Sequence, residues 1–198
     1  LSFGIAHMST AAAQFMHTHP AIHIEMDLSD KRVDMIAEGF DVAIRIGNLT
    51  DSSLIAKKIS SVSVLPTASP GLIAQWPKLD HPDDLANMPA LAYANDRSSH
   101  DWSYVGPDGK PGNLNVTPRM SANNGDVLRD LAVAGLGMVS LPTFLHYEAI
   151  NKGLLKPLFP DYKWSGFDIF VVYPKTIVLP KRTRVFVDFI SGLYGKTP

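Results

Sequence analysis

The alternation of apolar and polar residues is clearest over residues 22–47, where it predicts a strand, a helix and a second strand. Four apolar residues alternate with polar ones, the period of a half-buried strand: Ile22, Ile24, Met26 and Leu28. Asp30 is placed to cap a helix whose apolar side carries Val33, Ile36 and Ala37, and Gly39 is placed to end it. Residues 40–44 form a short apolar run that suits a buried parallel strand. This order is typical of a right-handed β-α-β unit.

Helical spacing of apolar residues marks both ends of the chain. Ser2 is placed to cap a first helix of about 16 residues, with an apolar stripe of Ile5, Met8, Ala12, Phe15 and Met16. After Pro180, the apolar face of a last helix consists of Val185, Phe186, Phe189, Ile190 and Leu193. Both helices therefore have one side to bury.

The middle of the chain is cut into short pieces by proline and glycine. Strands are expected at 53–59, 61–68, 91–93, 114–120, 138–141 and 167–173, a short helix at Pro70 and a capped turn at 81–85. Asn123 or Asn124 is expected to cap a helix, and a further helix covers 144–150. Because this middle part has its own β-α-β order, it suggests an inserted lobe reached by two chain crossings, near Thr67 and Phe167.

Composition narrows the class of protein. With 198 residues the chain is long enough for one large domain or two lobes. Its net charge is −1, so these residues do not provide the basic surface that is typical of a nucleic-acid binder. The absence of cysteine excludes disulfides and thiolate metal sites and fits a reducing compartment. No apolar run approaches the roughly 20 residues that span a bilayer.

Two consecutive motifs, LSDKRVD at residues 28–34 and EGFDVAIRIG at residues 38–47, resemble the effector-binding domain of LysR-type transcriptional regulators. Further segments follow in the order of that family, and the resemblance covers essentially the whole chain. These segments are DSSL at 51–54, ASP at 68–70, HPDDL at 81–85, NNG at 123–125, AGLG at 134–137, LP at 141–142 and the stretch from Val172 to Phe189.

The resemblance implies an α/β, two-lobed fold like that of type II periplasmic binding proteins, with a hinge of two crossing strands. Lobe I is expected to comprise residues 1–66 and 168–198, and lobe II residues 67–167. A small-molecule effector is expected in the cleft between the lobes. Members carry an N-terminal winged helix-turn-helix, absent from this chain, and the implied protein is a cytoplasmic homodimer or homotetramer that contacts DNA only through that domain. The family also has a strand before the segment matching Ser2-Phe3-Gly4, so we expect an apolar strand immediately before Leu1.

Polar residues at the expected strand ends and helix starts are the candidate site. Ser2 and the Asn123-Asn124 pair begin helices, where unpaired N–H groups favour an anion, and Ser29 follows a strand. Helix capping is the alternative role for Ser2 and Asn124. The expected effector is a small anionic or polar molecule, and the expected effector-binding residues are Ser2, Phe3, Ser29, Arg45, Arg97, Asn123 and Asn124.

Arg45 is the sharpest candidate because its charge follows the apolar run Val42-Ala43-Ile44. Such a side chain must reach water, a ligand or a buried partner. The alternative is a structural ion pair with Asp41 or Asp126. Arg97 and His100 lie in a polar loop, for which a solvated role is an equal alternative.

Other chemistries find less support. His17, His19 and His23 straddle Pro20 without a carboxylate that would complete a metal site. A Gly-x-Ser-x-Gly elbow and a phosphate-binding glycine loop are both missing, so no catalytic residue, metal or cofactor is expected. The sequence therefore favours an effector sensor over an enzyme, and a solute-binding protein of a transport system is the alternative that shares the fold.

The first helix also predicts self-association. Its residues Ala11, Ala12, Phe15 and Met16 offer more apolar surface than one lobe is expected to cover. In the family this helix packs on a second-lobe helix of a partner chain, here residues 124–134. The resemblance thus implies an antiparallel, two-fold dimer.

Overall fold

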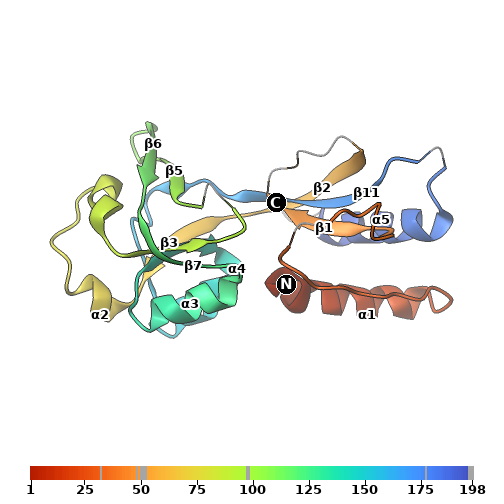
Figure 1. Cartoon of the computed structure of the whole chain (residues 1–198), viewed down its shortest axis with the longest axis horizontal. Helices are drawn as coiled ribbons and strands as arrows, with labels where there is room; N and C mark the ends of the chain where they lie inside the picture. The colour runs from red at the N-terminus through yellow and green to blue at the C-terminus, as the bar shows by residue number, and fades with distance from the viewer. Residues whose placement is uncertain (32, 48, 50–52, 97–98, 177, 196–198) are drawn as a thin grey trace. The chain divides into compact units, whose positions relative to one another are not determined.

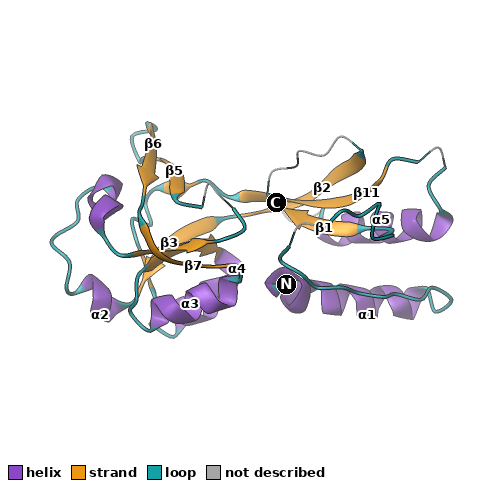
Figure 2. Cartoon of the chain, viewed as in Figure 1, coloured by secondary structure: helices purple, strands orange, loops and turns teal. Residues whose placement is uncertain are grey.

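The structure, a computed structural model, describes residues 1–31, 33–47, 49, 53–96, 99–176 and 178–195, and it divides into two compact units (Figure 1). Unit 1 contains Leu1, Phe3–Val62 and Phe167–Pro198, and unit 2 contains Ser2 and Ser63–Gly166. Each unit combines helices with sheet, as the α/β class predicted (Figure 2).

Unit 1 is built on an antiparallel sheet of three strands, in the order β1 (Ala43–Ile46), β11 (Phe167–Pro174) and β2 (Leu54–Val62). The first helix runs as η1 (Gly4–Met8) into α1 (Ser9–Thr18), and the last is α5 (Lys181–Tyr194). These helices and one face of the sheet enclose a core of Met8, Ala11, Ile59, Ile169, Val171, Val187 and Ile190.

The first helix is confirmed, but its apolar stripe is not the one predicted. Phe15 is fully buried against the rings of Phe186 (5.0 Å) and Phe189 (5.2 Å) of α5. Ile5 and Met16 are instead 59% and 46% exposed, because the buried line runs through positions 4, 8, 11 and 15. Helical spacing thus predicted the helix correctly, but it wrongly predicted that Ile5 and Met16 are buried.

The predicted β-α-β unit over residues 22–44 is wrong. Residues 22–28 form no strand, and β1 pairs antiparallel with β11. The expected helix is a single turn, and its cap is Asp34 in place of Asp30. Oδ1 of Asp34 accepts the N–H groups of Ile36 (3.0 Å) and Ala37 (3.1 Å). Gly39, at φ +76°, ends that turn as predicted. Alternation specifies a period but supplies no ladder partner, and a strand requires one. The strand expected before Leu1 stays a prediction.

Unit 2 contains a five-stranded sheet in the order β7 (Pro118–Ala122), β4 (Ala90–Tyr93), β8 (Met138–Pro142), β3 (Val64–Ala68) and β9 (Lys156–Pro157). The strands β7, β4 and β8 are mutually parallel, and β3 is antiparallel to β8 and β9. Helices α3 (Gly125–Val133) and α4 (Thr143–Asn151) share a core with one face of this sheet, made of Leu91, Leu128, Ala132, Val139, Leu141, Ala149 and Leu155.

The opposite face of the five-stranded sheet packs against a second hydrophobic core. A small antiparallel sheet, β10 (Lys163–Trp164), β5 (Asp101–Val105) and β6 (Pro111–Asn115), lies there with η2 (Pro82–Asn87) and α2 (Pro70–Ile73). The strand β5 was not predicted. The single strand expected at 114–120 is wrong, since β6 ends at Asn115 and β7 begins at Pro118. A proline lacks the ladder N–H and is typical of a strand's first residue.

Candidate functional site

The candidate site in unit 2 is the start of α3, where several polar groups lie together. Asn124 caps the helix by accepting the N–H of Val127 at 3.1 Å, and Asn123 precedes it as an exposed side chain. Gly125 is buried, and the side chain of Leu145 in α4 packs so closely on it that a Cβ at position 125 would lie 2.5 Å away. The tight packing of α3 on α4 thus fixes the direction of the helix start.

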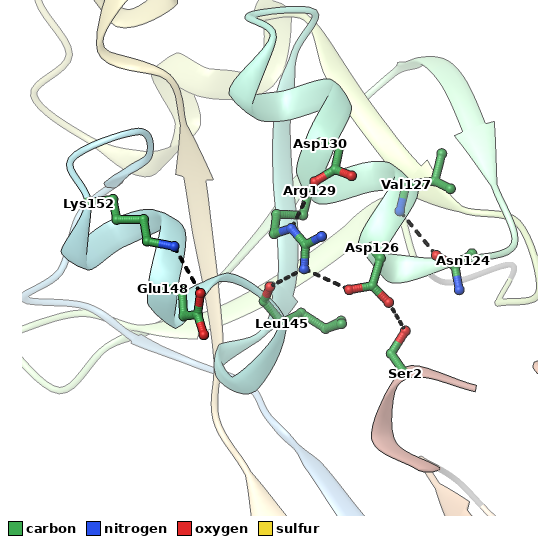
Figure 3. A network of polar contacts seen from close by, with 9 residues as sticks. All are labelled: Ser2, Asn124, Asp126, Val127, Arg129, Asp130, Leu145, Glu148 and Lys152. Carbon is green, nitrogen blue, oxygen red and sulfur yellow. Dashed lines mark hydrogen bonds and ion pairs between the residues drawn. The ribbon is translucent and has the colours of Figure 1, made fainter. Parts of the chain in front are cut away.

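Ser2 joins this helix start through a carboxylate that the sequence analysis did not place in the site. The Ser2 hydroxyl donates to Oδ2 of Asp126 at 2.5 Å (Figure 3). The other carboxylate oxygen accepts from Nη1 of Arg129 at 2.6 Å, one helical turn along. The spacing Asp126-x-x-Arg129 is the sequence signal that would have indicated this pair. Ser2 therefore does not act as a helix cap but as a donor to Asp126.

Arg129 connects the helix start to its neighbour α4. Its Nε donates to Asp130 at 2.9 Å, and Nη1 also donates to the backbone carbonyl of Leu145 at 3.1 Å (Figure 3). Burial disfavours the charged guanidinium, but Asp130 and Asp126 outweigh it and raise the pKa of Arg129. The cation is therefore permanent and compensates the carboxylate beside Ser2.

His146 follows Leu145 in α4 and is completely buried. Its Nδ1 lies 3.3 Å from the hydroxyl of Thr67 in β3, and its Nε2 has no hydrogen-bond partner among the described residues. Burial, reinforced by the positive charge of Arg129, lowers the pKa of His146 to about 4. The imidazole is therefore neutral at neutral pH.

In unit 1, Arg45 projects from β1 on the side opposite to its neighbours Ile44 and Ile46, which pack on the core. Its Nη2 donates to the backbone carbonyl of Val33 at 2.9 Å. The two suggested ion-pair partners are engaged elsewhere, Asp41 with Arg182 (3.3 Å) and Asp126 with Arg129. Because a guanidinium has five donors, this bond leaves others for a ligand.

Two other predicted residues in the described part of unit 1, Ser29 and Phe3, make contacts of their own. Ser29 is exposed, and its hydroxyl accepts the N–H of Lys31 at 3.2 Å. The ring of Phe3 lies 4.8 Å from that of His7 and 6.4 Å from that of Tyr194. Arg97 lies outside the described residues. Within unit 2, Ser2, Asn123 and Asn124 are brought to the start of α3.

Two features of the described residues bear on other functions. Their His, Asp and Glu side chains form no group of three suited to hold a metal ion. In the same part of the chain, every helix is too short or too polar to cross a membrane.

Comparison with known proteins gives a consistent result. Residues 1–193 match the family model described as the LysR substrate binding domain. An uncharacterised HTH-type transcriptional regulator of Haemophilus influenzae is 35% identical over 189 residues, which cover 94% of this chain and 65% of the relative. The chain spans about two thirds or less of the curated relatives that it matches.

Solved structures agree with this match. The regulatory domain of CrgA, a LysR-type transcriptional regulator of Neisseria meningitidis, is 27% identical with a TM-score of 0.80, covering 98% of this chain and 95% of that one. The regulatory domain of the C227S variant of AphB from Vibrio vulnificus is 28% identical with a TM-score of 0.79, covering 97% and 94%.

Proposed function

The chain belongs to the LysR substrate-binding domain family, the effector-binding regulatory domain of LysR-type transcriptional regulators, and from this we propose how it works. A small molecule binds to this domain, and its occupancy controls DNA binding by a helix-turn-helix domain of the same regulator. The observation that carries the proposal is the family match across residues 1–193. The matched relatives are named as transcriptional regulators, which favours this role over that of a transport protein.

The same proposal covers organisation and location. The proposed lobes are residues 1–66 with 168–198 and residues 67–167. Support comes from the two compact units, whose boundaries at 62–63 and 166–167 lie within a few residues of the proposed ones. The domain senses and does not catalyse, and it acts in the cytoplasm. A broad screen for turnover of small substrates tests the first of these statements, and any reproducible activity that follows the purified protein contradicts it.

The proposed effector-binding residues remain Ser2, Phe3, Ser29, Arg45, Arg97, Asn123 and Asn124, and the proposed effector is small and anionic or polar. Support comes from the donors of Arg45 and from the polar start of α3. A helix start favours an anion, and a guanidinium can bind a carboxylate through two parallel hydrogen bonds.

The test begins with a thermal-shift screen of small carboxylic acids and polar metabolites, followed by calorimetric titration of each hit. Replacing Arg45 by Ala should weaken an anionic effector by about 1.5–3 kcal/mol, roughly one to two decades. Lys should restore only part of this, because it lacks the forked geometry. If Arg45→Ala folds normally and binds as tightly as the wild type, the role assigned to Arg45 fails.

Asp126 offers an independent test of effector charge. An anion that contacts Ser2 must compete with the Asp126 carboxylate, which already takes the serine hydroxyl. Asp126→Asn should therefore tighten an anionic effector by roughly 3- to 10-fold, about 1 kcal/mol for a partly exposed charge. Asp130→Asn is the control, because it removes the same charge from the other side of Arg129. Weaker binding in Asp126→Asn alone would contradict an anionic effector and favour a cationic one.

Self-association belongs to the same proposal, with a corrected set of residues. Ala11 and Phe15, which the sequence assigned to the contact, are buried within unit 1. Ile5, Ala12 and Met16 remain for a partner chain, and Val127 of α3 is 46% exposed as their proposed counterpart. We retain the two-fold pairing of the first helix with α3 on this narrower surface.

A further inference from the structure

A second group of titratable side chains lies in unit 2 where η2 begins. His81 is the N-cap of η2, and its Nδ1 accepts the N–H of Asp83 at 3.3 Å. In return, Oδ2 of Asp84 accepts the N–H groups of His81 (2.9 Å) and Asp80 (2.8 Å). This is a capping box in which an imidazole replaces the usual serine or threonine hydroxyl. It requires Nδ1 to carry no proton.

The same nitrogen faces a second partner. Nδ1 of His81 also lies 3.3 Å from Oδ2 of Asp83. A ring nitrogen either accepts or donates a hydrogen bond, so it serves one of these two partners at a time. Without a proton it accepts from the Asp83 N–H, and with a proton it donates to the Asp83 carboxylate.

Asp83 also contacts the buried aromatic residue Tyr104. Its Oδ1 accepts the hydroxyl of Tyr104 at 3.1 Å, and Tyr104 is only 5% exposed. The Tyr104 ring fills the space that a Cβ at Gly112 would enter, 2.3 Å away. The ring of His81 lies edge-on to those of Tyr104 (6.0 Å) and Tyr162 (5.8 Å). Asp83 is therefore bonded to a side chain of β5 that packs on β6.

We propose that His81 is a proton-operated switch in unit 2. A proton from solvent on Nδ1 exchanges the helix cap for an ion pair with Asp83, and the altered Asp83 carboxylate shifts Tyr104 and the small sheet β10-β5-β6. Histidine suits this role because its charge ordinarily changes between pH 5 and 8. The switch is independent of the proposed effector.

Several charged side chains surround His81 in unit 2. Asp83 and Asp84 face the ring from η2, and Asp108, paired with Lys110 at 2.8 Å, faces it from the β5–β6 turn. Backbone N–H groups lower the pKa of Asp84 and the Lys110 side chain lowers that of Asp108, with His81 contributing to both. Tyr104 and Tyr162 are the neutral titratable neighbours. Asp80, before the cap, pairs with Lys78 at 2.7 Å.

The test is nuclear magnetic resonance of the isotopically labelled chain between pH 8 and 5. The ring nitrogens of His81 should show the tautomer protonated on Nε2 at pH 8. On acidification, the Asp83 amide and the Tyr104 ring signals should move along the same curve as His81. A neutral His81 that carries its proton on Nδ1, or Tyr104 signals that stay constant while His81 titrates, would overturn the proposal.

Variants separate the switch from general charge effects. Asp83→Asn should abolish the response of Tyr104 to His81, whereas Asp80→Asn, an equal change of charge at a residue paired with Lys78, should preserve it. If Asp83→Asn does not fold, Tyr104→Phe keeps the ring and removes the hydroxyl, and it should uncouple the ring at position 104 while the Asp83 amide still follows His81. Persistent coupling in Tyr104→Phe would contradict the pathway through Asp83.

Discussion

At the scale of single residues, the burial of His146 makes the folded state sensitive to acid. Its pKa of about 4 in the folded state lies below the ordinary value of 6.5, so unfolding takes up a proton. The contribution to stability is complete above pH 6.5, declines as the pH falls and is lost once the pH is below about 4. A shift of this size corresponds to about 3 kcal/mol.

Replacing His146 by Phe, which carries no charge at any pH, should therefore flatten the dependence of unfolding free energy on pH between 6.5 and 4. Urea unfolding at a series of pH values measures this. His17→Gln, a change at an exposed histidine, is the control and should keep the wild-type slope. An unchanged slope in His146→Phe would mean that the imidazole is already charged in the folded protein.

Gly112 provides a second residue-scale prediction, on packing. A methyl group there would overlap the ring of Tyr104, which is too buried to swing aside. Gly112→Ala should cost about 1–3 kcal/mol of unfolding free energy. Gly71→Ala in α2 is the matched control, because nothing lies within 4 Å of its Cβ position. Equal melting temperatures for the two variants would contradict the described contact.

At the scale of elements, the sequence predicted best the helices whose ends are marked by a capping residue or a proline. The short helix predicted at Pro70 and the helix predicted to begin at Asn123 or Asn124 both begin where they were expected. Residues 22–28 show the limit, because their alternation carries no information about which strand lies beside them. Pairing depends on distant segments, as when β1 joins β11 across more than a hundred residues.

The candidate site follows the same division. The capping role of Asn124 is local, and the sequence predicted it. The bond from Ser2 to Asp126 joins residues 124 positions apart, and no pattern along the chain indicates it. The sequence predicts that Arg45 needs water, a ligand or a partner. It cannot identify the backbone carbonyl of Val33 as that partner, because every residue carries a carbonyl.

The first helix yields the element-scale prediction. Met16 is exposed on α1, so Met16→Glu would place a charge in the proposed dimer contact without disturbing the core. Light scattering should give a dimeric or larger mass for the wild type and a smaller mass for Met16→Glu. Val178→Glu, at a residue 76% exposed outside both helices, should leave the mass unchanged. A monomeric wild type at high concentration would contradict the proposed contact.

At the scale of the whole molecule, the family match accounts for two observations that single residues leave unexplained. Apart from Ser2, which is grouped with unit 2, the chain passes between its two units at 62–63 and at 166–167, and the last 32 residues complete unit 1. The family match over residues 1–193 spans both units. The proposed role of such a domain is to convert effector occupancy into a change of DNA binding.

The most direct test of that role is the affinity of the regulator for its operator, measured by fluorescence anisotropy at increasing concentrations of an effector identified by calorimetry. The measurement uses the domain together with the helix-turn-helix domain proposed for the same regulator, at fixed salt concentration. Our account predicts an operator dissociation constant or binding pattern that changes with effector concentration, at the midpoint found by calorimetry, and a loss of this response in Arg45→Ala. An effector that saturates the domain and leaves operator binding unchanged would contradict it.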